Sequence, residues 1–152
     1  MSTLAEIFEP IVAFADIDLN EIRIVAFDTD GTLVRVEKEG HRQVRCSADK
    51  NIAGLFRLLH DNKAELGLEE VVIISGHTAH AESLLEKAGL RPSIPDRVED
   101  RTSFYNRVRG KNVLAVDDDA MLGMMAKACV NPKDERVQKY LNEASRRGLN
   151  IS

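Results

Sequence analysis

Three short apolar runs, each followed by polar residues, constrain what this chain can fold into. They occupy residues 22–27, 71–75 and 112–116 and are rich in β-branched side chains. Runs of this length and composition are typical of strands buried on both faces, as in a parallel sheet covered by helices. Segments with helical spacing of apolar residues lie between them. The sequence therefore predicts an α/β fold, built from crossover units around a mostly parallel sheet.

The polar residues that follow these runs predict a site at one edge of the sheet. Asp28 and Asp30 follow the first run, Ser75 ends the second, and residues 117–119, all aspartates, follow the third. Ligands of such sheets collect at the carboxyl ends of the strands. Neighbouring carboxylates repel each other unless a cation or a shared proton relieves them. Oxygen ligands of this kind favour Mg²⁺ over zinc, so we expect a Mg²⁺ site.

Phosphate is the ligand that best suits this edge. A protein-bound Mg²⁺ usually keeps open positions that hold phosphate oxygens. Ser75 and Gly76, at the start of a predicted helix, would offer a hydroxyl and free backbone N–H groups to the same oxygens. The pattern therefore favours phosphoryl transfer, in which positioning and charge neutralisation do most of the work.

The segment after the first acidic turn predicts a β-hairpin over residues 33–46. Its apolar side chains fall on one face if Val36 pairs with Val44 and Val34 pairs with Cys46, with residues 39–41 as the loop. Ser47 would then cap the next helix. The helix after the second apolar run is expected to end at Lys87, before Gly89. Further helices are predicted at 3–15, with a break at Pro10, and around 103–108, 121–127 and 134–147. Extended segments are predicted at 94–98 and 128–130.

Length and composition restrict the class of protein. The chain has 152 residues, which suits one domain over 1–152. A net charge of −4 argues against nucleic acid as the main partner, and no apolar run is long enough to cross a bilayer. The N-terminus lacks the basic start of a signal peptide, so we expect a cytoplasmic protein with Cys46 and Cys129 as reduced thiols.

Three stretches resemble motifs of the haloacid dehalogenase (HAD) superfamily of phosphohydrolases. "AFDTDGTLV" at 26–34 resembles its first motif, "VVIISGH" at 71–77 its second, and "VLAVDDDAML" at 113–122 its fourth. The resemblance spans residues 22 to about 130 in the family's order, and the first motif is the specific one. It implies a Rossmann-like three-layer sandwich and a Mg²⁺-dependent phosphatase acting on a small phosphorylated metabolite.

The same resemblance implies roles for individual residues. Asp28 would attack phosphorus, and Asp30 would act as the general acid and base. The metal would be held by Asp28, the backbone carbonyl of Asp30 and one acid of the 117–119 cluster, with Asp117 the first choice and Asp118 the second. The residues expected to bind the substrate phosphate are Thr29, Ser75, Gly76 and Arg101.

The family's third motif, a phosphate-binding lysine, has no direct counterpart. The interval 91–116 contains no lysine until Lys111, which would lie at the end of its strand opposite the site. Arg101, just before a predicted helix, is the best-placed substitute, and Arg97 is the next. An arginine supplies the positive charge and a bidentate fork.

Chain length also excludes the cap domain that many family members carry. Only 46 residues separate Asp28 from Ser75, and the hairpin and one helix use most of them. The chain is therefore similar to the capless branch, typified by the 3-deoxy-manno-octulosonate 8-phosphate phosphatases. In that branch the hairpin flap joins subunits of a tetramer, so the resemblance implies a homo-oligomer such as a homotetramer. Substrate specificity would lie in the hairpin, residues 76–80 and residues 91–101.

Two other functions compete with the phosphatase. The missing lysine suggests a catalytically weak or inactive relative that binds a phosphometabolite or a partner protein. The third apolar run with its aspartates also looks like the first strand of a receiver domain. Only 33 residues follow Asp119, too few for the rest of such a domain.

Overall fold

A computed structural model describes residues 2–91, 94, 96–119 and 125–146. Its centre is a six-stranded sheet with the strand order β1-β8-β7-β2-β5-β6. All neighbouring strands are parallel except β1, which runs antiparallel to β8. The strands are β1 (Phe14–Ala15), β2 (Ile24–Asp28), β5 (Glu70–Ser75), β6 (Val98–Asp100), β7 (Val113–Val116) and β8 (Ala128–Val130).

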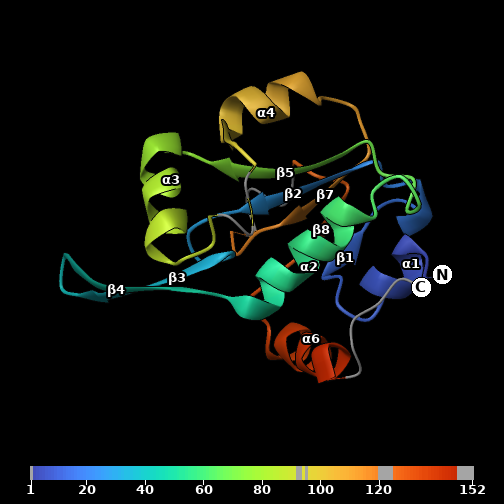
Figure 1. The fold of residues 1–152 in the computed structure, drawn as a ribbon. Helices are drawn as coiled ribbons and strands as arrows, with labels where there is room; N and C mark the ends of the chain where they lie inside the picture. The colour runs from blue at the N-terminus through green and yellow to red at the C-terminus, as the bar shows by residue number, and fades with distance from the viewer. Residues whose placement is uncertain (1, 92–93, 95, 120–124, 147–152) are drawn as a thin grey trace.

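Helices cover both faces of this sheet (Figure 1). The side chains of β2 alternate between two apolar clusters, because successive residues of a strand point to opposite faces. Val25 and Phe27 belong to the larger cluster, and Ile24 and Ala26 to the smaller one with Phe104 of α4. The predicted α/β class with a mostly parallel sheet is thus confirmed. The helical elements are α1 (Leu4–Phe8), η1 (Leu19–Glu21), α2 (Lys50–Asp61), α3 (Thr78–Lys87), α4 (Arg101–Arg107) and α6 (Glu135–Arg146).

Several predicted element bounds need correction. The helix expected at 3–15 ends at Phe8, before the expected break at Pro10, and the chain then joins the sheet as β1. The extended segment expected at 94–98 is the strand β6, which begins only at Val98, where it pairs with Ile73. Most of the helix expected at 121–127 lies outside the described residues, and its described end, 125–127, is a turn and bend.

The predicted hairpin is present, but its register was wrong. β3 (Val34–Glu39) and β4 (Arg42–Ala48) pair Val34 with Ala48 and Val36 with Cys46, two residues from the expected pairing. The turn has only two residues, with Gly40 at φ +63°, and a bulge between Glu37 and Lys38 shifts the ladder. A glycine tolerates this left-handed conformation at no steric cost.

The longer β4 also moves the cap of the next helix. The strand continues through Ala48, so Asp49, not Ser47, caps α2 by accepting a hydrogen bond from the Ile52 N–H at 3.1 Å. The hairpin extends away from the sheet (Figure 1), while Val36, Cys46 and Ala48 pack against the larger apolar cluster. Part of its apolar face is therefore used within the chain, and assembly through the hairpin stays a prediction.

Two further expectations concern the cysteines and membrane-spanning helices. Both Cys46 and Cys129 are free thiols, the first half-buried and the second buried, as expected. Within the described ranges, no helix has the length and apolar character that crossing a membrane requires.

Candidate functional site

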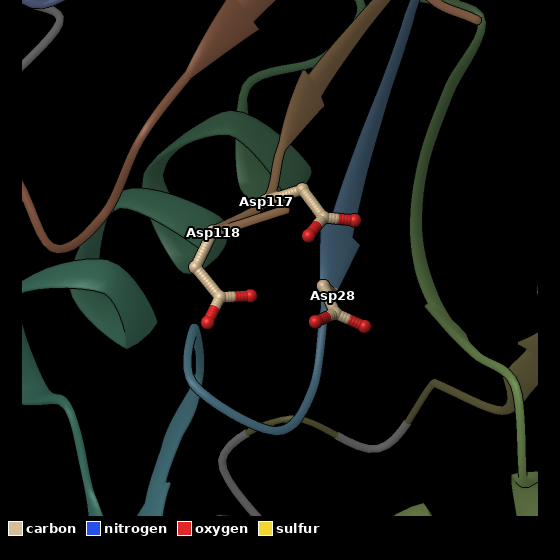
Figure 2. A group of neighbouring side chains, drawn as sticks. All are labelled: Asp28, Asp117 and Asp118. Atoms are coloured by element: carbon tan, nitrogen blue, oxygen red, sulfur yellow. The ribbon is translucent and has the colours of Figure 1, made fainter. Parts of the chain in front are cut away.

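Three carboxylates meet at the carboxyl edge of the sheet. Asp28 is the last residue of β2, and Asp117 and Asp118 directly follow β7. Because β2 and β7 run parallel with Phe27 beside Val116, the residues after these two positions come together. One oxygen atom of each carboxylate lies within 4.8 Å of the others, and the three side chains point into a common space (Figure 2). The predicted meeting of these acidic strand ends at one edge of the sheet is thus present.

The environment of these carboxylates opposes their ionisation. Asp28 has a side chain that is 8% exposed, and burial raises its pKa to about 7. The negative charge of Asp117 adds to this rise, while the positive charge of Arg101 counteracts it. Burial likewise raises the pKa of Asp117 to about 6, although the Asp119 N–H donates a hydrogen bond to its Oδ1 at 2.9 Å. Such a pair needs positive charge nearby to ionise fully.

Arg101 supplies one positive charge directly. Its Nη2 lies 2.6 Å from Asp28 Oδ1. Arg101 is the first residue of α4 and follows β6, whose last residue, Asp100, pairs with Ser75. The guanidinium passes over Gly76, where an added Cβ would lie 3.4 Å from Nη1. Gly76 and Arg101 are thus brought together beside Asp28.

The two alternatives to Arg101 lie elsewhere. Arg97 is exposed and precedes β6, at the amino end of that strand. Lys111 is exposed and precedes β7. Since the strands are parallel, Lys111 lies at the edge of the sheet opposite the carboxylates, while Arg97, just before the Val98–Ile73 pair, lies level with the middle of β5. Of these three cations, Arg101 is the one that the fold places beside Asp28.

The three carboxylates fit a hard divalent cation. Asp117 Oδ2 is buried and has no hydrogen-bond partner among the described residues, so one ligand atom is available. Gly31, at φ +80°, lies so close to Asp118 that an added Cβ would be 2.5 Å from Oδ2. The glycine thus lets Asp118 approach the turn after β2. An oxygen-only donor set of this kind suits Mg²⁺ or Ca²⁺ rather than a soft metal.

Asp30 occupies a different position from the other acids. It is exposed, and its carboxylate does not belong to the group of three. It forms an isolated bridge with Val34, whose N–H bonds to the Thr29 carbonyl and whose carbonyl accepts from Gly31. No described backbone N–H donates to the Asp30 carbonyl, which leaves this oxygen available as the metal ligand that the family resemblance implies.

The remaining residues predicted to bind phosphate have defined partners. The Thr29 hydroxyl is fully buried and donates to the Ile74 carbonyl at 3.3 Å, while the Thr29 backbone lowers the pKa of Asp28 by hydrogen bonding. Ser75 Oγ accepts from the His77 N–H at 3.1 Å and closes the turn before α3. Thr29 therefore links β2 to β5, and Ser75 shapes the start of the helix.

Sequence reasoning missed two residues at this site. Lys133 Nζ lies 2.9 Å from Asp118 Oδ2, and this hydrogen bond raises the pKa of the lysine. Tyr105, one turn after Arg101 on α4, has a buried hydroxyl with no partner among the described residues, and burial raises its pKa to about 12. Lys133 follows β8 by three residues, so the strand-end rule applied to β8 would have found it. Tyr105 lies four residues after Arg101, and this spacing places two side chains on the same face of a helix, which could have indicated Tyr105.

Comparison with protein-family models, with curated proteins and with solved structures gave no match. The geometry described above and the three sequence motifs are therefore the grounds for assigning a function.

Proposed function

We propose that this chain is a Mg²⁺-dependent phosphomonoesterase of the HAD superfamily. The observation that carries the proposal is the convergence of Asp28, Asp117 and Asp118 within 4.8 Å, with Arg101 bonded to Asp28. The four residues come from three separate strand ends, and each matches a position where the family resemblance implies a functional group.

Asp28 acts as the nucleophile in this proposal. Its carboxylate attacks the phosphorus of the ester, and an aspartyl phosphate forms as the bond to the ester oxygen breaks. Asp30 donates its proton to the departing oxygen, so the product leaves as a neutral alcohol. Asp30 then accepts a proton from water, whose oxygen attacks phosphorus. This second step regenerates Asp28 and releases inorganic phosphate.

Charge balance determines how well Asp28 performs this role. Asp28 attacks only when ionised, and burial raises its pKa to about 7. Arg101 lowers that pKa and can donate hydrogen bonds to phosphate oxygens from the same guanidinium. Mg²⁺, held by Asp28, Asp117, Asp118 and the Asp30 carbonyl, would supply further positive charge for the carboxylates and the phosphoryl group.

One observation favours a second candidate, a non-catalytic relative that binds a phosphometabolite. The proposed acid and base, Asp30, is exposed and lies outside the group of three carboxylates. A protein of this kind would retain the metal and phosphate sites without positioning the proton donor.

Release of phosphate from p-nitrophenyl phosphate distinguishes the two candidates. The assay compares Mg²⁺ with EDTA for the wild type, for Asp28→Asn and for Asp16→Asn, an exposed acid whose backbone N–H bonds to the Lys127 carbonyl just before β8. Mg²⁺-dependent turnover that is lost only in Asp28→Asn is the result expected of the enzyme. Absence of turnover in a wild type that still binds Mg²⁺ by calorimetry would establish the binding protein.

A further inference from the structure

Lys133 places a positive charge on one of the three carboxylates. Its Nζ lies 2.9 Å from Asp118 Oδ2, and an added Cβ at Gly31 would lie 2.5 Å from the same oxygen. This oxygen is therefore close to both the lysine and the turn after β2, toward which the Asp118 side chain points in Figure 2. The hydrogen bond to Asp118 raises the pKa of Lys133, and the charges of Asp30 and Asp28 add to the rise. The ammonium group thus interacts with several acids of the proposed metal site.

The turn between β8 and α6 holds the backbone of Lys133 in place. Asn131 Oδ1 accepts a hydrogen bond from the Lys133 N–H at 3.0 Å, an arrangement typical of turns. Pro132 is buried, and its carbonyl accepts from Gln138 Nε2 at 2.8 Å. The same Nε2 donates to Asp49 Oδ2 at 3.0 Å. None of these bonds involves the side chain of Lys133, so that side chain can change partners without rearranging the turn.

The two cations of the site differ in how firmly they are held. The Lys133 side chain is 65% exposed, whereas the side chain of Arg101 is 23% exposed and bonds to the buried Asp28. An ion pair in contact with water contributes little net stability, because water competes for both charges. Lysine also carries a compact charge on a flexible stem. The contact between Lys133 and Asp118 is therefore the one that a metal ion can displace at the lower cost.

The Lys133 ammonium and a divalent cation would use the same carboxylate. Mg²⁺ requires oxygen ligands at short range in nearly octahedral geometry, and Asp118 is one of the three carboxylates that could provide them. An ammonium group 2.9 Å from Asp118 takes up part of the acceptor capacity of that carboxylate, and it repels a second cation. Both effects act in the same direction. Removing the charge of Lys133 should therefore strengthen metal binding.

We propose that Lys133 is a tethered competitor of the metal, whose ammonium group shares Asp118 with the divalent cation and lowers the affinity of the site. This inference rests on the metal site of the proposed function and adds a residue that controls its loading. The sequence motifs do not include Lys133, which reaches the site from the turn after β8. The opposite role, in which Lys133 orients Asp118 as a ligand, predicts weaker metal binding when the lysine is removed.

Calorimetric titration with Mg²⁺ at low ionic strength measures the sign of this effect. Lys133→Met removes the charge, and Lys139→Met is the matched control, because Lys139 is exposed on α6 and forms no ion pair with any described residue. We expect Lys133→Met to lower the Kd for Mg²⁺ by about three- to tenfold, and added salt should reduce this effect. Lys139→Met should change the Kd by less than about twofold, and so should Lys133→Arg, which keeps the charge. The rise in the thermal unfolding midpoint on adding Mg²⁺ gives a second readout, and it should be larger in Lys133→Met than in Lys139→Met.

The possible outcomes distinguish this inference from the proposed function. Equal or weaker Mg²⁺ binding in Lys133→Met, or an equal gain in Lys139→Met, overturns the inference and leaves the metal site standing. Tighter binding in Lys133→Met alone, in a protein that releases no phosphate from p-nitrophenyl phosphate, supports the inference and rejects the phosphatase. Absence of Mg²⁺ binding in the wild type and in all three variants rejects both.

Discussion

At the level of single residues, the site combines buried negative charge with one directly bonded arginine. Burial raises the pKa of both Asp28 and Asp117, the charge of Asp117 adds to the rise at Asp28, and Arg101 lowers the pKa of each. Arginine also differs from the lysine of the family motif in binding two oxygens at once. The balance of these charges leads to two predictions.

The first prediction concerns Arg101. Arg101→Ala should lower kcat/KM for p-nitrophenyl phosphate by about 10²–10³-fold, since a preorganised positive donor is lost. It should also move the acidic limb of the pH profile to higher pH, because Arg101 lowers the pKa of Asp28. Arg101→Lys should restore part of the rate. Arg97→Ala, at an exposed position before β6, serves as the control, and an equal loss in that variant would contradict the assignment.

The second prediction concerns Asp117. Asp117→Asn should stabilise the protein in EDTA at about pH 8 by roughly 1–3 kcal/mol, because the neutral amide avoids the cost of ionising a buried group. The amide oxygen can still accept the hydrogen bond from Asp119. The same variant should lose Mg²⁺ binding. Urea unfolding measures the first effect and calorimetry the second, and a destabilised variant would show that Asp117 is not held at an unfavourable charge.

At the level of elements, the turn between β2 and β3 makes room for Asp118. Gly31 has φ +80°, and its missing side chain leaves room for Asp118. Gly110 has the same φ but nothing within 4 Å of an added Cβ. Substituting each glycine therefore distinguishes two effects: both substitutions strain the backbone, but only the one at Gly31 crowds Asp118.

The third prediction uses this pair. Gly31→Ala and Gly110→Ala should each destabilise the fold by about 1–2 kcal/mol, since both place a Cβ at positive φ. Only Gly31→Ala should also weaken Mg²⁺ binding, by about tenfold, because its Cβ displaces Asp118 from the group. Thermal unfolding and calorimetry measure the two effects. Equal Mg²⁺ affinity in both variants would show that Asp118 is not a ligand.

The secondary-structure elements were predictable from the sequence only in part. Buried strands and their polar ends were predictable, because apolar runs and strand-end placement follow from general rules of parallel sheets. The register of the hairpin was not, since a bulge and a two-residue turn at Gly40 leave no periodic signal that distinguishes two alternative pairings. Lys133 was missed because the strand-end rule was not applied to the short strand β8. The role of Asp49 depends on Gln138, which is distant in sequence.

At the level of the whole molecule, the site couples stability to pH and metal. Asp28 and Asp117 have folded pKa values of about 7 and about 6, above their ordinary value of 3.8. Between about pH 4 and pH 7 the folded chain therefore binds more protons at these groups than the unfolded chain does. These groups favour the fold fully at low pH, and that contribution is lost as the pH rises through their folded pKa values.

The fourth prediction follows from this coupling. In EDTA, the contribution of these two groups to the free energy of unfolding should fall by a few kcal/mol, about 2–5, between about pH 4 and about pH 8. Saturating Mg²⁺ should remove most of the fall, since a bound cation favours the ionised carboxylates. Subtracting the profile of the double variant Asp28→Asn/Asp117→Asn isolates the effect. Parallel profiles for the variant and the wild type would reject it.

The order of the central sheet has one more consequence, which concerns folding. β2 pairs directly with β7, so Asp28 meets Asp117 only after two strands from distant parts of the chain have paired. Contacts between residues so far apart in sequence form slowly, because a long loop must close first. Recovery of Mg²⁺ binding during refolding should therefore lag behind the formation of helices. The chain has no tryptophan, and the metal site would serve as its own reporter of the completed sheet.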